Sequence, residues 1–203
     1  VILLRFIAKN NLLKQYGLCK SPVPARQFLY YLPLIVLATG NLWNGATINF
    51  SLAETVCYIL CMLCVGLVEE VIFRGLLFRA VAKDNVKMAI AISSVTFGLG
   101  HLLNLVNGSG AKVAENLFQV SGAIAIGFLF VILFYRGGSL LPCIAAHAAI
   151  NIASAFADET GLTMERRVIL HLGMIALAAA YALILTKMLP PCAALQARKR
   201  GRG

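Results

Sequence analysis

The sequence predicts an all-α protein, a polytopic transmembrane helical bundle of about six spans. Two observations predict this fold class. First, 60% of the 203 residues are hydrophobic and only 13% are charged, and the mean hydropathy is +0.84. A soluble globular domain carries about 25% charged residues, so this chain is far too apolar to be one. Second, the apolar residues form several long runs, which is typical of a multi-span bundle in a single domain.

The apolar runs follow one another along the chain and are separated by short polar segments. A basic lead-in over residues 1–27 comes first, and its beginning is expected to be the end of an upstream span. Ser51 is a plausible N-cap of the second run, and Pro190-Pro191 stop the last one. We expect one membrane-embedded domain over residues 28–189 and a basic tail over 190–203. The predicted spans are residues 28–43, 52–82, 86–105, 113–135, 140–156 and 168–189.

The distribution of basic residues predicts the topology. The formal net charge is +10, but lysines and arginines cluster in the connections between spans, so nucleic acid is not a predicted partner. Cytoplasmic connections of membrane proteins are enriched in these residues. The lead-in, the region 74–87, Arg136, Lys187 and the tail hold 15 of the 18, which leaves Lys112, Arg166 and Arg167 on the other side. We therefore expect a multi-pass protein, in the plasma membrane, with both termini in the cytoplasm.

The six cysteines do not indicate a disulfide framework. Cys57, Cys61, Cys64 and Cys143 lie inside predicted spans, where thiols behave as small apolar side chains. Cys57, Cys61 and Cys64 share one helix face, and we assign them a structural role.

Three ionisable residues interrupt the second predicted span. Glu69, Glu70 and Arg74 lie within six residues of each other in an apolar stretch. Each charge at the centre of a span costs at least about 2.5–3.5 kcal/mol, so these groups require partners, water or a function. Glu70 and Arg74, at positions i and i+4, share a helix face and suit an ion pair. Glu69 points about 100° away from Glu70 and is expected to face a cavity as a general base.

Helix geometry places a histidine at the same depth as these glutamates. Asp84-Asn85 is the predicted turn between the second and third spans. Glu70 lies 14 residues before Asp84 and His101 lies 16 residues after Asn85. With a rise of about 1.5 Å per residue, both side chains lie roughly 20 Å from the turn. A carboxylate and an imidazole are therefore expected to meet inside the membrane.

A second polar pair lies in the fifth predicted span. His147 and Asn151 are at i and i+4 among small residues, and their N–H groups suit hydrogen bonding to one oxygen, as an oxyanion hole requires. Before His101, the glycines of Phe97-Gly98-Leu99-Gly100 allow a helix or a ligand to approach closely. Asn104 is a candidate supporting group one turn after His101. His171 has no polar companion in the sequence and is predicted to be a packing residue.

These motifs carry a family resemblance. In order along successive hydrophobic helices they are Glu69-Glu70-x-x-x-Arg74, Phe97-x-x-x-His101 and His147-x-x-x-Asn151. Over roughly residues 52–156 the chain resembles the CAAX protease and bacteriocin-processing family of intramembrane endopeptidases, also called the Abi family. The resemblance implies an enzyme that hydrolyses a peptide bond in a membrane-embedded cavity, which we expect to open toward the cytoplasm.

The resemblance also implies roles for single residues. Glu69 and His101 would activate a water molecule, His147 and Asn151 would stabilise the oxyanion, and Glu70 with Arg74 would support the site. No cofactor is required by this mechanism. The alternative is a zinc metalloprotease with Glu69, His101 and His147 as ligands, although no HExxH pair lies on one helix.

Two non-proteolytic readings stay open at this stage. The polar core would be a binding site in a bacteriocin-immunity or scaffolding membrane protein, and charged residues in spans also mark ion paths in transporters. The expected partners are the lipid bilayer and a peptide or protein substrate at the membrane, including one that carries a lipid.

Overall fold

The fold is taken from a computed structural model of the chain, which describes residues 2–106 and 112–192. These residues form helices, and the one β-bridge among them joins Ala46 to Ala157. This confirms the predicted all-α bundle. The helices are α1 (Ile2–Lys9), η1 (Ala25–Tyr31), α2 (Leu32–Ala38), η2 (Gly40–Leu42), α3 (Leu52–Glu70), η3 (Val71–Phe78), α4 (Arg79–Val81), α5 (Val86–Gly100), η4 (His101–Leu105), α6 (Val113–Gly137), α7 (Leu141–Ser154) and α8 (Met164–Met188).

Four helical stretches in the described residues are long and apolar enough to cross a membrane: Leu52–Val81, Val86–Leu105, Val113–Gly137 and Met164–Met188. The first combines α3, the π-helical segment η3 and α4, and a capping box begins it. The Ser51 hydroxyl accepts from the Glu54 N–H, and the Glu54 carboxylate accepts from the Ser51 N–H. With these four stretches and its membrane-protease family resemblance, the chain is an integral membrane protein.

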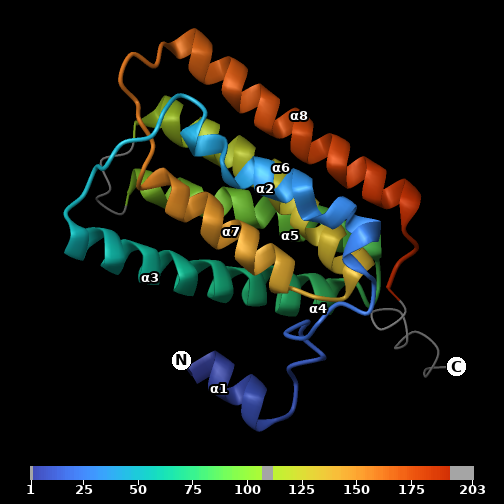
Figure 1. The fold of residues 1–203 in the computed structure, drawn as a ribbon. Coiled ribbons are helices and arrows are strands. Elements are labelled where there is room, and N and C mark those ends of the chain that lie inside the picture. Colours follow the sequence, from blue (N-terminus) through green and yellow to red (C-terminus); the bar gives the residue numbers. More distant parts are fainter. Residues whose placement is uncertain (1, 107–111, 193–203) are drawn as a thin grey trace, which may run out of the picture.

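The helices pack as a bundle with α6 near its centre. In Figure 1, α6 lies between α8 and α5, and α7 and α3 lie together on the lower side. Gly66 of α3 lies against the backbone of Ala148, where an added Cβ would come within 3.1 Å of the amide nitrogen. Such close approach brings α3 and α7 near enough for their polar side chains to meet.

Residues 28–43, expected as one continuous span, form three short helices instead. Leu29, Tyr30 and Tyr31 have φ values of 52°, 51° and 60°, in the left-handed region that ends a right-handed helix. The freed carbonyl of Phe28 accepts a hydrogen bond from the buried Tyr181 hydroxyl at 2.7 Å. The segment is held by contacts with α8 that its apolar composition did not reveal.

Helix α7 is shorter than the predicted span over residues 140–156. It has 14 residues, with Pro142 in its first turn, and is about 21 Å long. The hydrocarbon core of a bilayer is about 30 Å thick, so one end of α7 lies below the membrane surface. The polar residues on α7 are consequently close to the segment that follows it.

The described connections gather at two ends of the bundle. At one end, the α4–α5 turn, the end of α6 and the lead-in meet: Ser21 donates to the Gly137 carbonyl at 2.7 Å. At the other end, residues before α3 bind those after α7: Asn49 donates to the Ala155 and Ala157 carbonyls at 3.1 and 2.9 Å. The predicted turn at Asp84-Asn85 is present, and the Asn85 side chain caps α5.

Candidate active site

Glu70 and Arg74 form a fully buried ion pair. Nη1 of Arg74 lies 3.0 Å from Oε1 of Glu70, and both side chains have no exposed surface. The second guanidinium nitrogen donates to the Gly127 carbonyl at 3.2 Å, and the guanidinium carbon lies 4.2 Å from the Phe97 ring centroid. The i, i+4 spacing thus produces the predicted pair. Its partners on α5 and α6, Phe97 and Gly127, hold the pair in place, and we call it the buried support of the site.

His147 binds this support directly. Its Nδ1 lies 2.9 Å from Oε1 of Glu70, and its Nε2 lies 3.6 Å from Oε2 of Glu69. The ring is nearly buried and meets Phe97 edge-on, with 5.5 Å between ring centroids. The histidine that approaches the two glutamates is therefore His147, whereas helix arithmetic placed His101 at that depth. The packing of α7 against α3 is the cause, and it acts between residues 77 positions apart.

His101 is the first residue of η4 and directly follows α5, which ends at Gly100. Its ring packs edge-on against Phe97, and its carbonyl accepts from the buried Asn116 side chain at 2.8 Å. Among the described contacts, no direct hydrogen bond joins His101 to Glu69. The two residues nevertheless line the same cavity.

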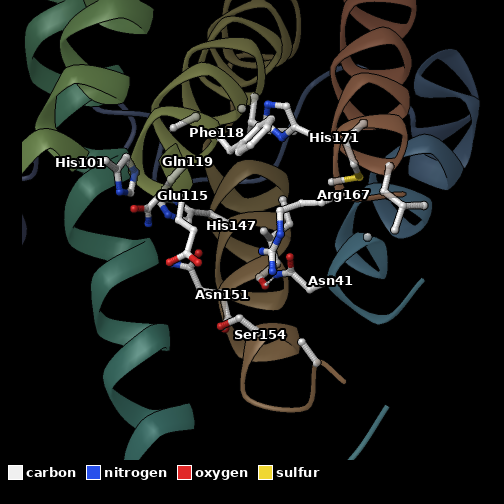
Figure 2. A pocket seen from close by; sticks show the side chains of 18 of the residues that line it. Asn41, His101, Glu115, Phe118, Gln119, His147, Asn151, Ser154, Arg167 and His171 are labelled. Carbon is white, nitrogen blue, oxygen red and sulfur yellow. Dashed lines mark hydrogen bonds between the residues drawn. The ribbon is translucent and has the colours of Figure 1, made fainter. Parts of the chain in front are cut away.

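The cavity has a volume of about 620 Å³ and lies between α3, α5, α6, α7 and α8. Figure 2 shows His101 and His171 entering it from opposite sides, with His147 and Asn151 between them on α7. Glu69, whose side chain is 35% exposed, also lines the cavity. All four predicted catalytic residues therefore border one space. They are Glu69, His101, His147 and Asn151.

The cavity reaches the bundle end where residues before α3 bind those after α7. Its lining there includes Asn44, Glu115 and Asp158, all in or next to connections between helices. The lysine and arginine count predicts that this end lies away from the cytoplasm. The expected cytoplasmic opening and the expected topology therefore conflict with each other, and both stay predictions.

Several polar residues of the cavity wall were missed or misjudged from the sequence. His171 is not without a polar companion: its Nε2 lies 2.9 Å from the Ser121 hydroxyl. The Asn104 amide donates to Gln119 at 2.9 Å, which connects η4 to α6. On α8, Arg167 precedes His171 by one turn, and both line the cavity. The i, i+4 spacing of Arg167 and His171 was the one signal in the sequence that could have identified α8 as a polar wall of the cavity.

The proposed zinc ligands do not fit a metal ion in this arrangement. The described residues contain no group of three histidine, cysteine, aspartate or glutamate side chains that could hold a metal. Zinc sites of catalytic type need three converging protein ligands. We therefore derive no chemical step through a metal.

The fold and the site describe a polytopic membrane protein in which Glu69 and His147 line a cavity and buried Glu70 holds His147 from behind. Comparison with known protein families shows the family to which it belongs. Residues 51–153 match the family model of the Rce1-like type II CAAX prenyl endopeptidases. The chain belongs to this family, as its three motifs indicated. No curated protein and no solved structure matches it. Family membership supports protease activity of the CAAX type.

Proposed function

We propose that the protein is an intramembrane endopeptidase in which Glu69 activates water and hydrolyses a peptide bond at the bottom of the cavity. The observation that carries the proposal is the position of His147, between buried Glu70 and the partly exposed Glu69. The two carboxylates next to this imidazole have different surroundings. Glu70 can therefore fix the ring while Glu69 exchanges protons.

In the proposed reaction, Glu69 takes a proton from a water molecule, with His101 orienting that water from the opposite wall. The hydroxide attacks the carbonyl carbon of the scissile bond and forms a tetrahedral intermediate. His147 and Asn151 donate hydrogen bonds to its oxyanion. The intermediate then collapses, the C–N bond breaks, and Glu69 returns its proton to the leaving amine.

Glu70 and Arg74 act as positioning residues in this scheme. Hydrogen bonding of Nδ1 to Glu70 orients the ring and leaves Nε2 directed toward Glu69. The 3.6 Å between Nε2 and the Glu69 oxygen exceeds a direct hydrogen bond and suits a bridging water or substrate oxygen. Oε2 of Glu70 and Nε of Arg74 lack hydrogen-bond partners among the described residues, a cost that functional sites commonly bear.

The proposal is tested by Glu69→Gln, which keeps the side-chain volume and removes the base. Loss of a general base lowers rates by about 10²–10⁴-fold, so cleavage should fall by that factor with unchanged folding. New protein N-termini in membranes that contain the wild-type or the variant enzyme provide the readout. Glu54→Gln, at the start of α3 and away from the cavity lining, is the matched control. Equal cleavage by the Glu69→Gln and wild-type enzymes contradicts the proposal.

A further inference from the structure

The side chain of His101 makes few polar contacts of its own. Among the described residues, neither ring nitrogen has a hydrogen-bond partner, and the ring packs edge-on against Phe97 with 5.7 Å between the ring centroids. The ring nevertheless enters the cavity from one wall (Figure 2). Because no hydrogen bond to these residues holds the ring directly, its position depends on the backbone that carries it.

Asn116 holds that backbone. Its Nδ2 donates to the His101 carbonyl at 2.8 Å, and this bond joins α6 to the first residue of η4. Asn116 is 1% exposed, and its Oδ1 has no hydrogen-bond partner in the described part of the chain. Burying a carboxamide with one end unpaired is unfavourable, so packing alone does not favour an asparagine at this position. The bond to His101 is the contact that accounts for it.

A second hydrogen bond joins the same two helices. The Asn104 side chain donates to Gln119 at 2.9 Å. Since η4 has about three residues per turn, His101 and Asn104 lie on the same side of it. Asn116 and Gln119 have the same spacing on α6 and share a face there. Helix η4 is therefore attached to α6 at two neighbouring points, and the Asn116 bond is the one made to His101 itself.

We propose that Asn116 is a positioning residue, which fixes the His101 ring at the cavity wall by holding the His101 backbone. The inference rests on the proposed function for what His101 does there, namely orienting the attacking water. Asn116 is not among the described residues that line the cavity, so it acts on the reaction through His101. A displacement of about 1 Å at a reacting group can lower a rate by about 10²-fold.

Histidine-selective isotope labelling of the full chain tests the positioning without catalysis. The chain has three histidines, so its ring signals in NMR spectra are few, and single histidine-to-alanine variants assign them. Asn116→Leu removes the donor at similar volume, and Asn116→Ala removes it without any added bulk. In both variants the ring signals of His101 should shift by more than those of His171. Shifts at His101 that are equal to or smaller than those at His171 overturn the proposal.

Enzyme kinetics test the consequence for the reaction. The substrate is a synthetic peptide that spans a cleavage site found through the N-termini that depend on Glu69. For Asn116→Ala, kcat per folded enzyme should fall by about 10–10²-fold with KM nearly unchanged, because His101 orients water and not the peptide. Tyr181→Phe is the matched control, since it also removes a buried hydrogen bond from a side chain to a carbonyl, away from the cavity lining. Its kcat should stay near the wild-type value.

The outcomes separate this inference from the proposed function. A wild-type kcat for Asn116→Ala overturns the inference and leaves the role of Glu69 intact. An equal fall of kcat in Asn116→Ala and Tyr181→Phe also overturns it, because the effect is then one of general stability. Normal cleavage by the Glu69→Gln enzyme would instead refute the proposed function, while the NMR result on the position of His101 stands.

Discussion

Glu70 has two functions in the structure that a carboxylate can combine. It neutralises Arg74, which has no exposed surface, and it binds Nδ1 of His147. An isolated buried carboxylate would be costly, and so would an isolated guanidinium. The pair therefore tolerates the loss of both charges better than the loss of one.

A double-mutant cycle tests this coupling. Arg74→Met leaves Glu70 buried and unneutralised, so it should lower the free energy of unfolding by about 3–5 kcal/mol. Combining it with Glu70→Gln removes the unpaired charge and should recover a substantial part of that loss. Thermal unfolding in detergent, followed by circular dichroism, measures the stability of the single and the double variant. Additive losses in the double variant would show that the two residues are energetically independent.

The candidate site also gives a prediction about metal removal. Since the described residues offer no three-ligand group for a metal, cleavage should continue after treatment with a strong chelator. Metal analysis of the purified protein accompanies the activity measurement. Stoichiometric zinc, together with cleavage that is abolished by chelation and restored by zinc, would establish the metalloprotease alternative.

At the level of helices, the two glycines before His101 have different surroundings. A Cβ on Gly98 would lie 3.0 Å from the Ile124 nitrogen and 3.0 Å from the Val120 carbonyl oxygen of α6. A Cβ on Gly100 would meet nothing within 4 Å. Gly98 thus sets the spacing between α5 and α6, and Gly100 has open space beside it.

This difference predicts opposite effects of the same substitution. Gly98→Ala pushes α5 away from α6, and overpacking of this kind costs about 1–3 kcal/mol. Gly100→Ala introduces no clash and improves helix propensity by up to about 1 kcal/mol. Thermal unfolding of the two variants in detergent should move the midpoint down for Gly98→Ala and leave it equal or higher for Gly100→Ala. A lower midpoint for Gly100→Ala alone would contradict the assigned packing.

Local spacing explains which features were predictable from the sequence. The Glu70–Arg74 pair and the Asp84-Asn85 turn depend on helix periodicity and turn chemistry within a few residues. The contact of His147 with Glu70 depends on how α7 packs on α3, which no local rule supplies. The break at residues 29–31 was invisible because leucine and tyrosine do not signal a left-handed backbone as glycine does.

For the whole molecule, two connections that bind each other frame the end of the bundle that the cavity reaches. Thr47 donates its backbone N–H to the Phe156 carbonyl at 2.9 Å, and Asn44 donates to the Asp158 carbonyl at 2.7 Å. These bonds join the residues before α3 to those after α7. Because α3 carries Glu69 and α7 carries His147, the frame also fixes the distance between the two halves of the proposed site.

Asn49 is the residue on which this frame can be tested. Its Nδ2 donates to the Ala155 and Ala157 carbonyls, so Asn49→Asp replaces a donor with a carboxylate that faces two acceptors. Each lost hydrogen bond costs about 0.5–1.5 kcal/mol, and the unfolding midpoint should fall. Cleavage should fall further than the unfolded fraction explains, because α3 and α7 lose their common anchor. The neighbouring Ile48, which is 81% exposed, gives the control Ile48→Ala, with both quantities expected near wild type. An Asn49→Asp enzyme of lower stability but normal cleavage at a temperature where it is folded would show that the frame does not position the site.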